Sequence, residues 1–136
     1  MWVSTDTEIV KLDADDGTEL WRTDVGGLCL ALDNDAGQVF GVGEVFTFGS
    51  APFDKGCGIK LDTDGTILGV FGGADEHEGF GSYPGRAIVV GDGAVYVGGE
   101  QWTVDVNTAG ADDFVAYRSG RVARWNSDDL QLTWLA

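Results

Sequence analysis

One strand–turn–strand motif occurs three times in this chain, and it constrains the fold more than any other feature. Its clearest copy is Glu8–Asp24, in which apolar residues flank the turn Asp13-Ala-Asp-Asp-Gly17. Asp and Gly favour tight turns because Asp hydrogen-bonds to its own backbone and Gly adopts positive φ freely. A second copy lies at 59–68 and a weaker one at 122–134. Internal repetition of this kind predicts an architecture built from repeated units.

A second kind of hairpin alternates with this motif. It consists of an apolar run, an Asp/Gly turn and a return rich in Val, Phe and Tyr, and it occurs at 28–42 and 86–97. No long segment keeps the i, i+3, i+4 apolar spacing of an amphipathic helix. The patterns therefore predict an all-β protein of about 11 strands with no helices.

We interpret the chain as a single domain, 1–136, made of three units that each combine the two hairpin kinds. Unit one is 1–24 and lacks its innermost strand, unit two is 28–72, and unit three is 86–135. Four antiparallel strands per unit and a period of about 40–60 residues are typical of β-propeller blades. The expected fold is a partial β-propeller of about 2.75 blades.

The repeat resembles that of the quinoprotein-type (PQQ-like) β-propellers. The likeness rests on Trp2-Val-Ser4 and on Val10-Lys-Leu-Asp-Ala-Asp-Asp-Gly-Thr-Glu-Leu-Trp21, and it extends over almost the whole chain. Unit two carries Gly69 where the repeat has its docking tryptophan, and unit three keeps Trp134 but loses the turn glycine. We expect Trp21 and Trp134 to fill the gaps between neighbouring blades. The resemblance implies the fold and not the quinone cofactor, because the chain has no adjacent cysteines and too few blades.

Strand direction predicts one face that gathers the long connections. The tight turns share one face of the blades, so the connections 43–57, 72–85 and 98–119 lie on the other. Function on a rigid scaffold concentrates on such loops, and aromatic residues among charges are typical of protein interfaces. The alternative is that these loops fold back over the blades and the central channel. The candidate interaction residues are Phe46, Phe48, Phe53, His77, Tyr83, Trp102, Tyr117 and Arg118.

The acidic composition limits the possible partners. The net charge is −15 and the pI is about 4.1, and phosphate backbones attract basic patches, so we expect no nucleic-acid binding. Solubility is the favoured reason for the acidity, and adaptation to cations or high salt is the alternative. No apolar run reaches the roughly 18 residues of a membrane span.

Asp75-Glu-His-Glu78 is the one cluster with metal-ligand chemistry. Four consecutive residues in an extended loop cannot all point to one centre. The favoured interpretation is therefore an exposed acidic loop, and Asp75, Glu76, His77 and Glu78 are weak metal candidates. His77 is the sole histidine and has no accompanying nucleophile, so we assign no catalytic residue and expect no cofactor.

The two cysteines are predicted to stay unbridged. Cys29 and Cys57 are expected two strands apart in one sheet, which places them about 9.6 Å apart. The Cα atoms of a disulfide seldom lie more than about 6.8 Å apart.

The leading functional hypothesis is a non-enzymatic structural or protein-interaction module in a larger assembly, such as a bacteriophage tail or capsid-associated component. The alternatives are a fragment of a quinone-dependent dehydrogenase and an envelope assembly or adhesion scaffold of the same repeat type. Closed propellers have about 4–8 blades. We therefore expect other protein subunits or further copies of the chain to complete the ring, in a virion or an extracytoplasmic setting.

Overall fold

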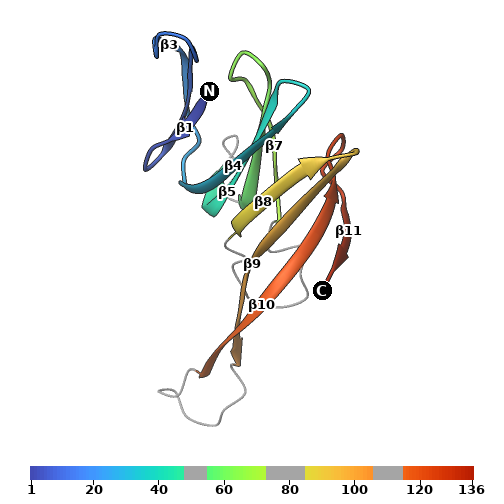
Figure 1. Ribbon diagram of the computed structural model, residues 1–136. Helices are drawn as coiled ribbons and strands as arrows, with labels where there is room; N and C mark the ends of the chain where they lie inside the picture. The colour runs from blue at the N-terminus through green and yellow to red at the C-terminus, as the bar shows by residue number, and fades with distance from the viewer. Residues whose placement is uncertain (48–54, 73–84, 106–114) are drawn as a thin grey trace.

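The computed structural model is all-β (Figure 1) and describes residues 1–47, 55–72, 85–105 and 115–136. These residues form eleven strands in three antiparallel sheets and contain no helix. The prediction of an all-β chain of about this many strands is confirmed.

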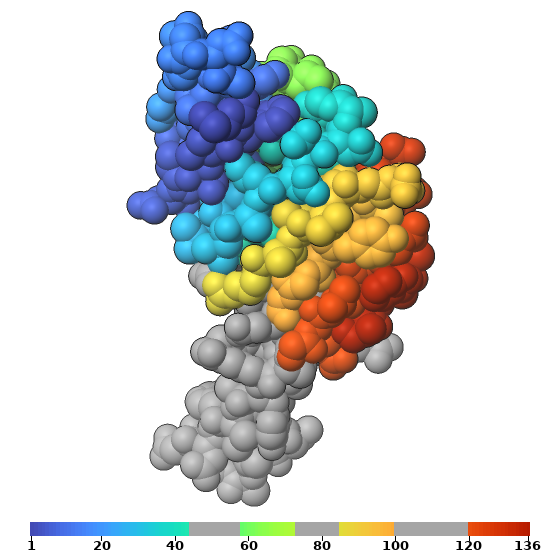
Figure 2. Space-filling model, in the orientation of Figure 1, coloured from blue at the N-terminus to red at the C-terminus, as the bar shows by residue number. Residues whose placement is uncertain are grey.

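Each sheet follows the order of its strands in the sequence. Sheet one is β1 (Trp2–Ser4), β2 (Glu8–Leu12) and β3 (Glu19–Asp24); sheet two is β4 (Leu28–Asp35), β5 (Gln38–Thr47), β6 (Lys55–Leu61) and β7 (Ile67–Phe71); sheet three is β8 (Gly85–Gly91), β9 (Ala94–Asp105), β10 (Val115–Asn126) and β11 (Leu132–Leu135). The three sheets stand in an open row in sequence order, with the N-terminus on sheet one and the C-terminus on sheet three (Figures 1 and 2). They do not close into a ring.

Two of the predicted long connections are shorter than the sequence indicated. The segment 98–119 was expected to be loop, but β9 and β10 pair as far as Val115 opposite Asp105. Part of the predicted connection 43–57 is also strand, because β5 extends to Thr47 and Thr47 pairs with Lys55 at the start of β6. Gly98 and Gly99 weaken the strand signal because they carry no side chain to pack, yet their backbones pair with β10. The resulting β9–β10 hairpin extends beyond the body of the molecule (Figure 1).

Two apolar cores hold the row of sheets together. The core between sheets one and two contains Ile9, Val25, Cys29, Val39, Ile59 and Leu61, and the core between sheets two and three contains Phe40, Val42, Phe71, Val95, Val97, Ala123 and Trp125. Sheet two contributes to both cores because successive residues of a strand point to opposite faces. Val39 thus faces sheet one while Phe40 faces sheet three.

The three repeats share one structural detail that fixes their correspondence. The last two strands of each sheet (β2–β3, β6–β7 and β10–β11) form its outer hairpin. Each outer hairpin has a register shift at the same place, after Lys11, Lys60 and Arg124. In each following turn one residue adopts positive φ: Gly17 at 75°, Gly65 at 86° and Leu130 at 59°. Leucine rarely adopts this conformation. The third turn nevertheless keeps the form of the first, because Leu130 N donates to the Asn126 carbonyl as Gly17 N donates to the Asp13 carbonyl, both at 3.0 Å.

Candidate protein-interaction surface

One row of side chains across neighbouring strands recurs in all three sheets. The row, here called the aromatic–cation row, is Trp2, Lys11 and Trp21 in sheet one, Phe40, Lys60 and Gly69 in sheet two, and Tyr96, Arg124 and Trp134 in sheet three. In every sheet the cation lies over the aromatic ring, at 5.6, 5.5 and 5.8 Å from its centroid. A cation at this distance from a ring face is attracted by the ring's quadrupole.

The row of sheet one is covered by sheet two. Trp21 Nε1 donates a hydrogen bond of 2.9 Å to the Thr63 carbonyl, in the turn between β6 and β7. Lys11 Nζ reaches the same carbonyl at 3.5 Å, and Thr23 Oγ1 donates to the Gly65 carbonyl at 2.6 Å. A Cβ atom on Gly65 would lie 2.8 Å from the Trp21 ring. A large side chain in one sheet therefore fits against a glycine in the next.

The row of sheet two is covered by sheet three in the same way. Here the glycine lies on the outer strand and the larger side chain lies in the turn of the next sheet. Lys60 Nζ donates to the Ser127 carbonyl at 2.6 Å and lies 3.4 Å from that of Asp128. Gly69 takes the position of the tryptophan, and a Cβ atom there would lie 3.0 Å from Leu130 Cδ1 of the next sheet. The side chain of Leu130 thus occupies part of the space that a tryptophan at position 69 would fill.

Replacing Lys60 with methionine is expected to lower the free energy of unfolding by about 1.5–3 kcal/mol. Lys60 is 5% exposed, so the change keeps the buried stem but leaves the Ser127 carbonyl without its charged donor. The measurement is urea unfolding followed by circular dichroism. Lys11→Met is the matched control, because its donor distance is 3.5 Å and Lys11 is only half-buried; we expect a loss below about 1 kcal/mol. Equal losses would contradict this account of Lys60.

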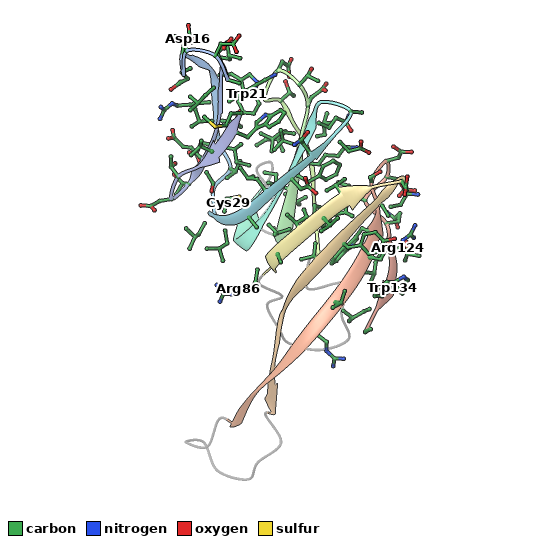
Figure 3. The ribbon with its side chains drawn as sticks, viewed as in Figure 1. Asp16, Trp21, Cys29, Arg86, Arg124 and Trp134 are labelled. Atoms are coloured by element: carbon green, nitrogen blue, oxygen red, sulfur yellow. The ribbon has the colours of Figure 1, made fainter. Side chains whose placement is uncertain are left out.

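The row of sheet three faces away from sheet two. Val95, Val97, Ala123 and Trp125 point into the core, so alternation places Tyr96 and Arg124 on the opposite face. Tyr96 is 39% exposed and Trp134 is 42% exposed, and Val89, opposite Tyr96 in the register, is 63% exposed. Within the described residues no other sheet covers this surface, which we call the outward face of sheet three (Figure 3).

The side chains of this outward face hold one another in place. Arg124 Nε lies 3.3 Å from the Tyr96 hydroxyl, and a terminal nitrogen of Arg124 donates to Thr133 Oγ1 at 3.1 Å. The Tyr96 and Trp134 rings are tilted with centroids 6.4 Å apart. Trp, Tyr and Arg are the residue types that carry most binding energy at protein interfaces, and prior ordering lowers the entropic cost of binding.

The loop-face residues predicted from the sequence have several different outcomes. Phe48, Phe53, Tyr83, Asp75, Glu76, His77 and Glu78 lie outside the described residues. Phe46 lies on β5, where it pairs with Gly56. Trp102 on β9 pairs directly with Arg118 on β10, and Tyr117 is next to Arg118. Among the described residues, the backbone thus brings Trp102, Tyr117 and Arg118 together.

Sequence reasoning missed Val89, Tyr96 and Arg124. Arg124 occupies the same repeat position as Lys11 and Lys60, one residue before the register shift. A cation at this point of every repeat was the signal that could have identified the row. Trp134 was predicted to dock between blades, and in the structure its ring belongs to the exposed row.

The burial of Cys29 makes its thiol unreactive. Cys29 is a free cysteine on β4, 5% exposed, and β5 lies between it and β6, which contains Cys57. Desolvation by burial raises the pKa of the Cys29 thiol to about 11. A thiol with this pKa is only about a thousandth ionised at pH 8, and the thiolate is the reactive form.

In a Cys57→Ser variant, we expect Cys29 to resist Ellman's reagent at pH 8 while the protein is folded and to react fully in guanidinium chloride. The absorbance of the released thionitrobenzoate measures the reaction. Circular dichroism checks that the variant is folded. Complete reaction of the folded protein within seconds would contradict the burial and raised pKa of this thiol.

The described residues contain no cluster of three or more His, Cys, Asp or Glu side chains arranged to hold a metal ion. They also contain no helix, and so none long and apolar enough to cross a membrane. Comparisons with models of known protein families, with curated proteins and with solved structures find no match for this chain. Its function is therefore inferred from its own surfaces.

Proposed function

We propose that this chain is a non-enzymatic β-propeller module of a larger protein assembly, and that a β-sheet of a neighbouring subunit packs on the outward face of sheet three. The observation that carries the proposal is the repeated aromatic–cation row. Two copies of the row are covered by the turn of the next sheet, and the third copy has the same ring–cation geometry and is exposed.

The arrangement of the sheets supports the propeller part of the proposal. Sheets two and three each have four antiparallel strands in sequence order. Their first strands are neighbours, because the Asp33 carboxylate on β4 accepts a 2.7 Å hydrogen bond from the Val90 amide on β8. Blades of a propeller are arranged radially in this way, with the first strand of each blade nearest the axis. An open row of three sheets needs further blades before a ring can close.

The charge of the chain supports a protein partner over a nucleic acid. A net charge of −15 repels phosphate backbones. The outward face of sheet three resembles the surfaces by which sheets contact one another inside the chain. Such a face suits an assembly of repeated protein subunits, such as a virion.

The outward face is tested with the apolar dye 1-anilinonaphthalene-8-sulfonate and the full-length chain. Light scattering behind size exclusion first gives the mass of the species. If the chain is monomeric, we expect saturable dye fluorescence that falls several-fold in a Val89→Thr/Trp134→Thr variant. If it is oligomeric, we expect the face to be covered and the double variant to dissociate the oligomer. A monomer whose dye binding is unchanged by both substitutions would overturn the proposal.

The absence of enzymatic activity is tested separately. Addition of pyrroloquinoline quinone and calcium, with alcohol or sugar substrates and an electron-accepting dye, is expected to give no oxidation above that of heat-denatured protein. Quinone-dependent reduction of the dye would overturn the non-enzymatic part of the proposal.

A further inference from the structure

The geometry of the repeats points to one occupant for the outward face of sheet three: sheet one of a second copy of this chain. We infer that Trp134 of one copy packs over Gly17 of the other, as Trp21 packs over Gly65 within the chain. This inference rests on the proposed function and narrows the neighbouring subunit to a copy of the same protein.

The three repeats correspond in register. The shared register shift aligns Lys11 with Lys60 and Arg124, and it aligns Trp21 with Gly69 and Trp134. Counting into the turns from the same point aligns Ala14 with Thr63 and Ser127. The turn of sheet two is one residue shorter, so the positive-φ residues align by counting back from the outer strand. Gly17, Gly65 and Leu130 each lie four positions before Trp21, Gly69 and Trp134.

The two contacts between sheets within the chain follow a size rule. Trp21 on the outer strand of sheet one faces Gly65 in the next turn, and Gly69 on the outer strand of sheet two faces Leu130. Each contact therefore pairs one large residue with one glycine. Trp134 is large, so the rule calls for a turn with glycine at the positive-φ position. Sheet one supplies that turn: Gly17 has φ 75°, and a Cβ atom there would meet nothing within 4 Å.

The turn of sheet one also offers a hydrogen-bond acceptor for the exposed cation. The Thr63 and Ser127 carbonyls accept from the cations of the preceding sheets, and Ala14 has the corresponding position in sheet one. The sheet-one turn is built like the turn that receives Lys60: Asp15 N donates to Asp13 Oδ1 at 2.8 Å and Asp128 N donates to Asn126 Oδ1 at 2.8 Å. It presents the Ala14 carbonyl in the same surroundings to Arg124 of a second copy.

The two surfaces are complementary in charge. The turn of sheet one carries the carboxylates of Asp13, Asp15 and Asp16, and Asp16 lies at the tip of the hairpin (Figure 3). Hydrogen bonds from Thr18 hold the pKa of Asp16 below its usual value, so the turn is anionic at neutral pH. Arg124 is the cation of the opposing surface. A guanidinium next to a carboxylate-rich turn is a favourable pairing.

The outer surface of sheet one contains both apolar and charged residues. Met1 is 56% exposed and Val3 is 40% exposed, at the positions that Val95 and Val97 hold in the core of sheet three. On β3 of sheet one, Glu19 and Arg22 hold the repeat positions that Leu132 and Leu135 hold on β11 of sheet three. Glu19 and Arg22 form an ion pair at 2.7 Å. A partly polar surface predicts a reversible contact between copies, weaker than the contacts within the chain.

This contact is heterologous, because each copy offers sheet three to its partner and receives the partner on sheet one. Such contacts close into a ring or continue as a filament. Two copies of three sheets each would supply six, which falls within the roughly 4–8 blades of closed propellers. We therefore expect a closed dimer. The charge of −15 on each copy opposes association, so the dimer should tighten as salt screens the repulsion.

The test is sedimentation velocity of the full-length chain across a wide concentration range, at low and moderate salt. The wild-type protein is expected to sediment as a dimer of 14.4 kDa chains. Trp134→Gly and Gly17→Leu should each weaken the dimer about 30-fold or more, as expected for loss of a central interface residue. The double variant Gly17→Leu/Trp134→Gly should recover it, because the new pair copies Gly69 and Leu130.

Two controls accompany these variants. Leu68→Gly removes a similarly exposed apolar side chain, 44% exposed on β7, and should leave the dimer unchanged. Leu130 already shows that leucine fits the positive-φ position of this turn, so Gly17→Leu should fold, which circular dichroism checks.

The possible results separate this inference from the proposed function. A wild-type chain that stays monomeric throughout, but binds the apolar dye on sheet three, would overturn self-docking and leave the protein-interaction module standing with a different partner. A dimer that both single variants leave intact would overturn the Trp134–Gly17 pairing, as would a double variant that is not rescued. Loss in each single variant with recovery in the double supports it.

Discussion

Replacing Trp125 with alanine is expected to lower the free energy of unfolding by about 3–5 kcal/mol. Trp125 is fully buried in the core between sheets two and three. Its ring lies 5.2 Å from that of Phe71, centroid to centroid, and contributes to sheet-to-sheet packing. Its removal deletes apolar contacts from both sheets and leaves a cavity that a rigid β-sheet cannot fill by local collapse.

Urea unfolding, followed by circular dichroism, measures this loss. The matched control is Trp134→Ala, which makes the same chemical change at a site that is 42% exposed. At a concentration where the chain is monomeric, we expect the control to lose about 1 kcal/mol or less. Similar losses in the two variants would mean that the core between sheets two and three does not dominate stability.

The strands and sheets were predictable because turn chemistry marks them. Asp and Gly at 13–17 and 62–65 separate short apolar runs, and such signals depend only on neighbours in the sequence. The third turn was harder to recognise, since Leu130 replaces the glycine. Its positive φ is accommodated by Asn126 and Asp129, whose side chains accept hydrogen bonds from backbone amides within the turn.

The lengths of the strands and the location of the exposed row were not predictable in the same way. In the sequence, Gly98 and Gly99 indicate the end of a strand. They nevertheless pair with β10, and this pairing depends on the whole hairpin. Sequence reasoning placed the candidate interaction site on the long connections. The exposed row became visible only when the register showed Tyr96, Arg124 and Trp134 side by side on the face opposite the core.

The exchange of large and small residues between sheets also needed the structure. From the sequence, Gly69 is a departure from the tryptophan expected at its position. In the structure it is compensated by Leu130, which lies 61 positions later in the chain and packs from the next sheet. Compensation between residues so distant in sequence leaves no local signal.

Replacing Gly58 with alanine is expected to destabilise the fold by about 3 kcal/mol, at the upper end of the usual cost of overpacking. Gly58 lies on β6 directly opposite Phe71 on β7. A Cβ atom at Gly58 would lie 2.1 Å from the tip of the Phe71 ring. The ring is 1% exposed and packs against Trp125, so it cannot move aside without disturbing the same core.

The backbone at Gly58 does not require glycine, because its φ is not in the left-handed region. Gly91→Ala is therefore a matched control: a Cβ atom there meets nothing within 4 Å, and we expect no loss, or a gain of about 0.5 kcal/mol. Phe71→Leu shortens the obstructing side chain and provides a rescue. In urea unfolding, the double variant Gly58→Ala/Phe71→Leu should be more stable than the sum of the single losses by at least about 1 kcal/mol. Additive losses would show that alanine at position 58 acts through the backbone and not through the Phe71 ring.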